Sequence, residues 1–435
     1  MTPLTWKFLT GALNPVVDDA VKELMTKQYD DNLALLIPVA KKLTVQAILE
    51  NDIRAQFGTA LRRPLGSPNY LSPWERILLN PRQLFELPAP DFEKIDTTTV
   101  IGKKAKKPLK LDIPIMITAM SNGGSLNENM KIALAKGAAM AGTSTNTGES
   151  TVVESERKAA KYLIGQYNRG GWLTDPEQLS QLDAIEVQLG QGAYGGAVHD
   201  AIKANEVTDY QREIWNIPEG EAAVIHARMP GINSTQDIIN LINRLKSEYD
   251  VPVGIKIAGS HFIEKELEVI SRTNADFITI DGSEGGTASA YVTNQDGVGF
   301  PTLFALARAV NLLEDKKLKD KYSLIIAGGL RTPAEFLRAL AIGADAVYIG
   351  TVAVMTALQT QIVKAVPETV PVQIALYNGK YQDKLNIDEA AINLTNFLKA
   401  AVLEMKHATQ TTGKTNVHDL SREDLVTMEK TWRNC

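Results

Sequence analysis

Short apolar runs, many of them β-branched, alternate with longer amphipathic stretches through the middle of the chain. This alternation predicts buried parallel strands joined by helices, that is, repeated βα units. Strands are predicted at 113–117, 142–145, 184–190, 251–257, 276–281, 324–326 and 346–349, with an eighth at 222–225. Helices are expected at 127–141, 235–249, 263–273, 301–313 and 332–343. The predicted fold class is therefore α/β, a (β/α)8 TIM barrel.

The segments on either side of the barrel follow other patterns. Residues 1–70 are predicted to form a helical N-terminal extension, and the proline-rich residues 71–110 a lead-in segment. The barrel is placed at 111–358. Residues 359–435 are expected to form a helical C-terminal extension, because apolar positions recur at helical spacing through 388–409.

Glycines follow the last two predicted strands. Gly328 and Gly329 end one of them, and Gly350 and Thr351 end the other. The loops after the last two strands of such a barrel commonly hold a phosphate. Glycine lets backbone N–H groups approach an anion, and the next helix N-terminus adds partial positive charge. The pattern predicts a phosphate-bearing cofactor.

Polar residues follow the other predicted strands. Lys256 lies in an apolar strand, so it must face the barrel mouth or find a partner, because an unpaired buried charge is costly. It could hold the polar edge of a flavin ring or form a Schiff base. The amides of Gln188 and Gln191 can both donate and accept at a heteroaromatic ring. Further candidates are Ala119, Met120, Ser121, Asn146, Glu149, Asp281, Glu284, Gly285, Gly286 and Thr287.

Each of these motifs alone also fits an ordinary turn or a helix cap. Their combination suits FMN, with its phosphate at the last two strands and its ring over the barrel mouth. A barrel that binds phosphate without flavin, such as a sugar-phosphate aldolase using Lys256, is the alternative from a different chemistry.

Composition and charge argue against several kinds of partner and cofactor. The chain carries 46 basic and 51 acidic residues, a net charge of −5, which argues against a nucleic-acid partner. The single cysteine, Cys435, excludes disulfides and cysteine-ligated clusters within the chain. The histidines show no metal-type spacing, so no metal is expected. No signal-peptide pattern or long apolar run is present, and we expect a soluble cytoplasmic protein without a membrane partner.

The motifs stand in the order found in the FMN-binding synthase domain of glutamate synthase, which the chain resembles from about residue 114 to 358. The matching segments are 119–121, 145–149, 185–193, 254–256, 276–287, 328–332 and 350–351. The resemblance implies an FMN-containing barrel in which 2-iminoglutarate is reduced by hydride from flavin N5. By position it places Ala119, Met120 and Ser121 along the flavin, Gln191 and Lys256 at its polar edge, Gly286, Gly329, Gly350 and Thr351 around the phosphate, and Glu149 near the substrate.

Several departures from that family stand out. The stretch after Gly350 that matches the family's cluster-binding segment, residues 355–359, contains no cysteine, so we expect no iron–sulfur cluster, and no stretch resembles the glutaminase domain. Gln188 replaces a family lysine, and residues 194–199 replace a lysine- and glycine-rich loop. Arg228 could then supply a cation for a substrate carboxylate.

The leading hypothesis is an FMN-dependent oxidoreductase acting on the CH–NH2 or imino carbon of glutamate or a similar small amino or oxo acid. Lys256, Glu149 and Gln188 are its expected catalytic residues, with Arg228 and Glu284 binding the substrate. A separate protein could donate electrons, and barrel enzymes often form homo-oligomers. Alternatives are an FMN barrel with non-redox isomerase or transferase chemistry, and a flavin-binding subunit that requires a partner.

Overall fold

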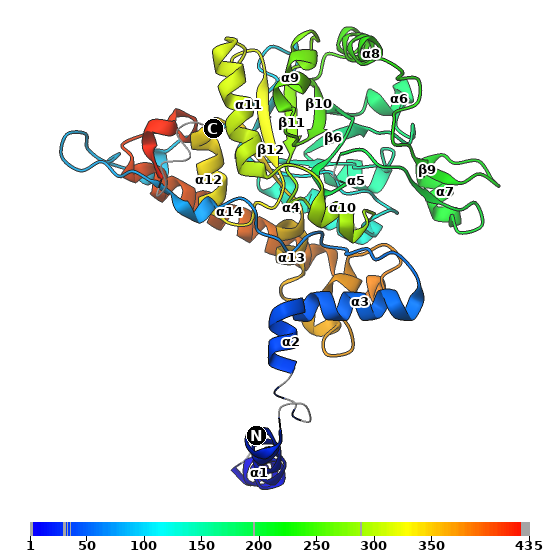
Figure 1. The fold of residues 1–435 in the computed structure, drawn as a ribbon. Coiled ribbons are helices and arrows are strands. Elements are labelled where there is room, and N and C mark those ends of the chain that lie inside the picture. Colours follow the sequence, from blue (N-terminus) through cyan, green and yellow to red (C-terminus); the bar gives the residue numbers. More distant parts are fainter. Residues whose placement is uncertain are drawn as a thin grey trace. The chain divides into compact units, whose positions relative to one another are not determined.

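The computed structural model describes residues 3–28, 32, 34, 36–194, 196–287 and 289–427 (Figure 1). Cys435, Gly195 of the segment 194–199 and Ala288, which follows the motif 276–287, lie outside the described residues. The chain divides into two compact units, Met1–Leu61 and Arg62–Cys435. The first contains the helices α1 (Pro3–Thr26), α2 (Leu36–Leu43) and α3 (Val45–Phe57).

Eight parallel strands form the centre of the second unit (Figure 1). They are β4 (Ile115–Ile117), β5 (Ser144–Asn146), β6 (Tyr162–Tyr167), β7 (Ala184–Gln188), β10 (Val253–Ala258), β11 (Phe277–Asp281), β12 (Ser323–Ala327) and β13 (Ala346–Ile349). Their hydrogen-bonded order is β4-β13-β12-β11-β10-β7-β6-β5. A parallel bridge between Ala119 and Asn146 joins the two ends of this sheet. The predicted (β/α)8 barrel is confirmed.

The prediction of the eighth strand was wrong. The barrel strand is β6, whereas residues 222–225 contribute to β9 (Ala223–Ile225), which pairs antiparallel with β8 (Asp200–Ile202) outside the barrel. The apolar run of β6 is interrupted by Gln166, whose side chain is buried and donates to Glu186 in the barrel interior. Because Gly165 precedes it, only Tyr162, Leu163 and Ile164 form an apolar run in β6, which is too short to indicate a strand by pattern.

Helices of this unit surround the barrel and also lie beside the β8–β9 pair (Figure 1). They are α4 (Glu128–Met140), α5 (Glu154–Ala159), α6 (Pro176–Leu179), α7 (Asp209–Trp215), α8 (Thr235–Glu248), α9 (Ile263–Ser271), α10 (Val292–Gly297), α11 (Thr302–Asp315), α12 (Pro333–Ile342), α13 (Thr351–Leu358) and α14 (Ile387–Thr411). The remaining strands form two antiparallel pairs, β1 (Ile77–Leu79) with β14 (Leu425–Thr427) and β2 (Thr99–Ile101) with β3 (Leu109–Leu111). Within the described residues, no helix has the length and apolar character needed to cross a membrane.

A buried carboxylate organises the polar part of the barrel interior. Glu186 is fully buried and accepts hydrogen bonds from Asn146 Nδ2 at 3.2 Å, Gln166 Nε2 at 3.1 Å and Thr279 Oγ1 at 2.8 Å. These donors come from β5, β6 and β11. Because a buried carboxylate is costly unless its oxygens are satisfied, this network holds the side chains of several strands in register below the barrel mouth.

Lys131 of α4 ties together the ends of the first two barrel strands. Its Nζ donates to the carbonyl oxygens of Met120 and Asn146, each at 2.7 Å, and lies 3.0 Å from Glu156 Oε1. Both charged side chains are 1% exposed. The pair therefore fixes the loops that follow β4 and β5, where the ladder of the sheet is interrupted.

We expect Lys131→Met to lower the free energy of unfolding by about 3 kcal/mol, because it leaves Glu156 buried without a counter-charge. Burial already raises the pKa of Glu156, and the neighbouring Lys131 opposes that rise. Urea unfolding at pH 7 measures the change. The double variant Lys131→Met/Glu156→Gln should recover part of the loss. An equal loss in the single and double variants would contradict this account.

Candidate functional site

A cavity of about 480 Å³ lies at the carboxyl ends of the barrel strands, a size typical of small-molecule sites. It brings together residues from most of the βα loops and from the segment 64–70, which precedes the barrel. The predicted site residues that line it are Ala119, Met120, Ser121, Glu149, Gln191, Lys256, Asp281, Glu284, Gly285, Gly286, Thr287, Gly328, Gly329, Gly350 and Thr351.

Three predicted site residues are not among those lining the cavity. Asn146 lies deeper in the barrel, where it donates to Glu186. Gln188 lies behind the cavity wall and donates to Glu149 Oε1 at 2.8 Å and to Gln191 Oε1 at 3.1 Å. Arg228 is exposed on the loop that follows β9. Its role in substrate binding stays a prediction.

One end of the cavity is built from closely packed backbone. A Cβ atom added at Gly286 would lie 2.7 Å from Leu65 O and 3.0 Å from Thr351 Oγ1. Gly329 has a φ of +68°, in the left-handed region that favours glycine. Gly350 immediately precedes α13, and no side chain caps that helix end. Free N–H groups of a helix start beside small residues can hold an anion.

The segment 64–70 is a part of the site that the sequence pattern did not reveal. It is anchored to the barrel unit by Arg63, which pairs with Asp296 at 2.7 Å, and by Arg62, which pairs with Asp200 at 2.9 Å. Both partner residues lie more than a hundred positions further along the chain, so no local sequence pattern indicates these ion pairs.

Tyr70 anchors the other end of this segment. Its hydroxyl donates to Glu335 Oε1 at 3.1 Å, and the Arg331 guanidinium carbon lies 3.8 Å from the ring centroid. Burial, together with the Glu335 carboxylate, raises the pKa of Tyr70 to about 12. The hydroxyl therefore stays protonated at neutral pH and holds the segment over the cavity.

Lys256 and Asp281 form the charged floor of the cavity. Lys256 is 2% exposed, and its Nζ lies 3.9 Å from Asp281 Oδ2. Asp281 also accepts a hydrogen bond from the Gly192 N–H at 3.1 Å. Burial raises the pKa of Asp281, and Lys256 opposes that rise. A cation held in this way can stabilise negative charge that develops in the cavity.

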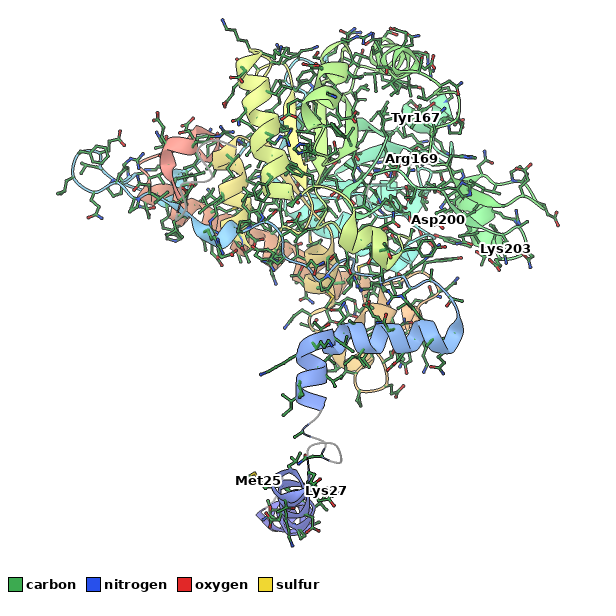
Figure 2. All side chains as sticks on the ribbon, in the orientation of Figure 1. Met25, Lys27, Tyr167, Arg169, Asp200 and Lys203 are labelled. Atoms are coloured by element: carbon green, nitrogen blue, oxygen red, sulfur yellow. The ribbon has the colours of Figure 1, made fainter. Side chains whose placement is uncertain are left out.

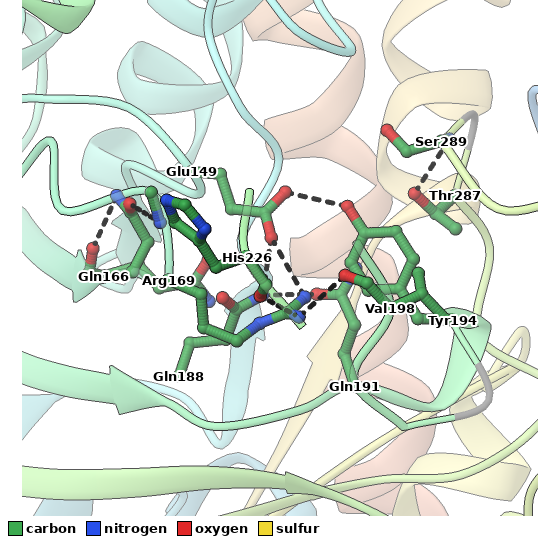
Figure 3. Close-up of polar contacts among 12 residues, drawn as sticks. Glu149, Gln166, Arg169, Gln188, Gln191, Tyr194, Val198, His226, Thr287 and Ser289 are labelled. Atoms are coloured by element: carbon green, nitrogen blue, oxygen red, sulfur yellow. Dashed lines mark hydrogen bonds and ion pairs between the residues drawn. The ribbon is translucent and has the colours of Figure 1, made fainter. Parts of the chain in front are cut away.

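A second polar cluster surrounds Glu149 (Figure 3). Glu149 Oε2 accepts from the Tyr194 hydroxyl at 2.9 Å, while Oε1 accepts from Gln188 and lies 3.8 Å from Arg169 Nη2. Burial and the nearby Glu149 raise the pKa of Tyr194 well above its usual value. Tyr194 is therefore a neutral donor.

Arg169 is a site residue that the sequence reasoning missed. It follows the end of β6 by two residues, and Figure 2 labels it beside Tyr167, the last residue of that strand. Since β6 itself was not predicted, nothing marked Arg169 as a strand-end residue. Recognising that strand is the signal that would have found it.

Fold and cavity together define a (β/α)8-barrel protein with a cavity at the carboxyl ends of its strands, where barrel enzymes place their active sites. A family model described as the conserved region in glutamate synthase matches residues 76–415. The glutamate synthase large subunit-like protein of Rhizobium meliloti is 33% identical over 359 residues, covering 78% of this chain and 80% of that protein. This chain belongs to the glutamate synthase family.

Two further proteins resemble this chain, one over a smaller share of its own length and the other at lower sequence identity. The archaeal-type glutamate synthase [NADPH] of Thermotoga maritima is 34% identical over 327 residues, covering 70% of this chain and 64% of that protein. This chain therefore spans less than two thirds of the Thermotoga protein. The flavin-binding domain of baker's yeast flavocytochrome b2 superposes with a TM-score of 0.52 at 17% identity, covering 86% of this chain and 81% of that structure. That likeness supports the fold.

Proposed function

We propose that this protein is an FMN-dependent oxidoreductase acting on the CH–NH2 or imino carbon of glutamate or a similar small amino or oxo acid. One observation carries the proposal. A single cavity has a glycine-lined anion cradle at one end, a buried lysine on its floor and a carboxylate cluster in its wall. Membership of the glutamate synthase family supports it.

The residues present fit FMN. Gly286, Gly329, Gly350 and Thr351 would hold the phosphate, because all four line the cavity and a Cβ atom at any of these glycines would crowd neighbouring protein atoms. Lys256 and Gln191 would hold the polar edge of the ring, with Ala119, Met120 and Ser121 against it. When bound, FMN supplies hydride transfer at N5.

The chain's own groups have separable tasks in this proposal. Lys256 supplies a fixed positive charge, which would stabilise negative charge on the polar edge of the bound flavin ring. Glu149, oriented by Gln188 and Tyr194, binds or moves a proton at the substrate nitrogen. The segment 64–70, held by its ion pairs, keeps water from the reacting atoms.

The proposed reaction also needs a source of electrons, and the enzyme has an oligomeric state. We propose that a separate electron-donor protein serves this cytoplasmic enzyme, that the chain itself holds no iron–sulfur cluster, and that it forms a homo-oligomer. Nucleic acid and membrane have no part in the proposed function.

The visible absorption spectrum of the purified protein tests the cofactor. We expect the bands of oxidised flavin and the release of about one FMN per chain on denaturation. Anaerobic addition of small amino acids should then bleach those bands if the bound flavin accepts hydride from them. A colourless protein that takes up no added FMN would overturn the proposal.

A further inference from the structure

Arg169 is a buried arginine with one free edge. The side chain is 1% exposed, and its Nη1 donates to the carbonyl oxygens of Val198 at 2.9 Å and His226 at 2.8 Å. Its Nε and Nη2 have no hydrogen-bond partner among the described residues. These two nitrogens form one side of the guanidinium fork, the geometry that binds a carboxylate through two parallel hydrogen bonds.

Unsatisfied buried donors are costly, and a charged one especially so. The two carbonyl contacts at Nη1 fix the orientation of the guanidinium, so its free edge cannot simply turn to solvent. An acceptor that is not part of the described chain would remove this cost. The free edge of Arg169 therefore points to a ligand.

Glu149 lies beside this edge without satisfying it. Its Oε1 is 3.8 Å from Arg169 Nη2, beyond hydrogen-bond length, because Gln188 and Tyr194 hold the carboxylate in another orientation (Figure 3). Glu149 lines the cavity, whereas Arg169 is not among the residues that line it. Because the two side chains lie 3.8 Å apart, a buried guanidinium stands next to a carboxylate of the cavity wall.

We propose that Arg169 and Glu149 together bind the zwitterionic head of a small α-amino acid. The ligand carboxylate accepts hydrogen bonds from Nε and Nη2 of Arg169. The ligand ammonium group donates to the Glu149 carboxylate. For both contacts to form, the Glu149 side chain rotates so that the ligand can reach Arg169. This inference rests on the proposed function, since it names the substrate class of the same site.

The other charges around the cavity limit the ligand's side chain. Among the described residues that line it, the cations are Lys256 and Arg331, which are paired with Asp281 and Glu335. A second carboxylate would therefore meet no free cation there, and it would be repelled by Glu284. Amino acids with a small neutral side chain should bind more tightly than glutamate, by about 10-fold or more.

The experiment compares the wild-type holoprotein with Arg169→Gln, Arg169→Lys and the control Arg244→Gln, which changes an exposed arginine of α8 that does not line the cavity. Isothermal calorimetry measures the binding of L-alanine, pyruvate, ethylamine and L-glutamate. FMN content and thermal unfolding are measured on each variant. We expect alanine to bind most tightly. Its affinity should fall about 30-fold or more in Arg169→Gln, fall less in Arg169→Lys, and stay unchanged in Arg244→Gln.

Glu149→Gln tests the other half of the site. It should remove the preference for alanine over pyruvate, because only alanine carries an ammonium group.

Several results would overturn the inference. Alanine could bind Arg169→Gln as tightly as it binds the wild type, or Arg244→Gln could weaken its binding as much as Arg169→Gln does, or the wild type could bind none of the four ligands. If Arg169→Gln fails to fold, Arg169→Lys must show the weakened alanine binding by itself. Failure of the cofactor proposal looks different, because FMN would then be absent from the wild type while alanine binding still depended on Arg169.

Discussion

Gly286→Val is expected to purify without flavin and to bind added FMN at least about 1,000-fold more weakly than the wild type. Even the first side-chain atom would lie 2.7 Å from Leu65 O, a backbone atom that cannot move away alone, and 3.0 Å from Thr351 Oγ1. A branched side chain also fills the space that the phosphate would occupy. Fluorescence titration of the flavin-free protein with FMN measures the affinity.

Gly297→Val is the matched control. Gly297 ends α10, and a Cβ atom there would meet nothing within 4 Å. The control should keep its flavin. Thermal unfolding of the flavin-free proteins separates loss of the site from loss of the fold. Retention of FMN by Gly286→Val at wild-type affinity would contradict the proposed phosphate position.

Lys256→Met should lower turnover by about 100- to 1,000-fold with any substrate that the holoenzyme oxidises or reduces, because a preorganised cation is removed from the cavity floor. We also expect a more negative reduction potential of the bound flavin, since the positive charge would favour the reduced anionic form. Steady-state kinetics and a potentiometric titration measure the two effects. A variant with wild-type turnover and potential would show that Lys256 has a structural role alone.

The same substitution changes how stability depends on pH. Burial raises the pKa of Asp281, and removal of Lys256 would raise it further. The folded state then holds this proton more tightly than the unfolded state. Stability must therefore fall as pH rises from the usual aspartate pKa to the raised folded-state value. Lys256→Met/Asp281→Asn should regain stability at pH 8 without regaining turnover, which separates the two roles of the lysine.

The barrel could be predicted wherever apolar residues dominate a strand. Strands such as Ile115–Ile117 and Ala346–Ile349 are buried on both faces, so their sequences read as continuous apolar runs. The strand Tyr162–Tyr167 was missed because its apolar run ends at Ile164, where Gly165 and the inward-facing Gln166 follow. Its replacement, 222–225, looked equally apolar but pairs outside the barrel. Local pattern does not say which sheet a strand joins.

By itself, the sequence determined the barrel class and the glycine loops that now line one cavity. Both depend on short-range chemistry, namely apolar periodicity and the small size of glycine. Only the tertiary structure decided which arginine stands near Glu149 and what covers the cavity. Arg169 is aligned by carbonyl groups 29 and 57 positions away, and Arg63 fastens the covering segment to a carboxylate 233 positions away. Such contacts are made by packing between distant segments, and nothing in the neighbouring residues specifies them.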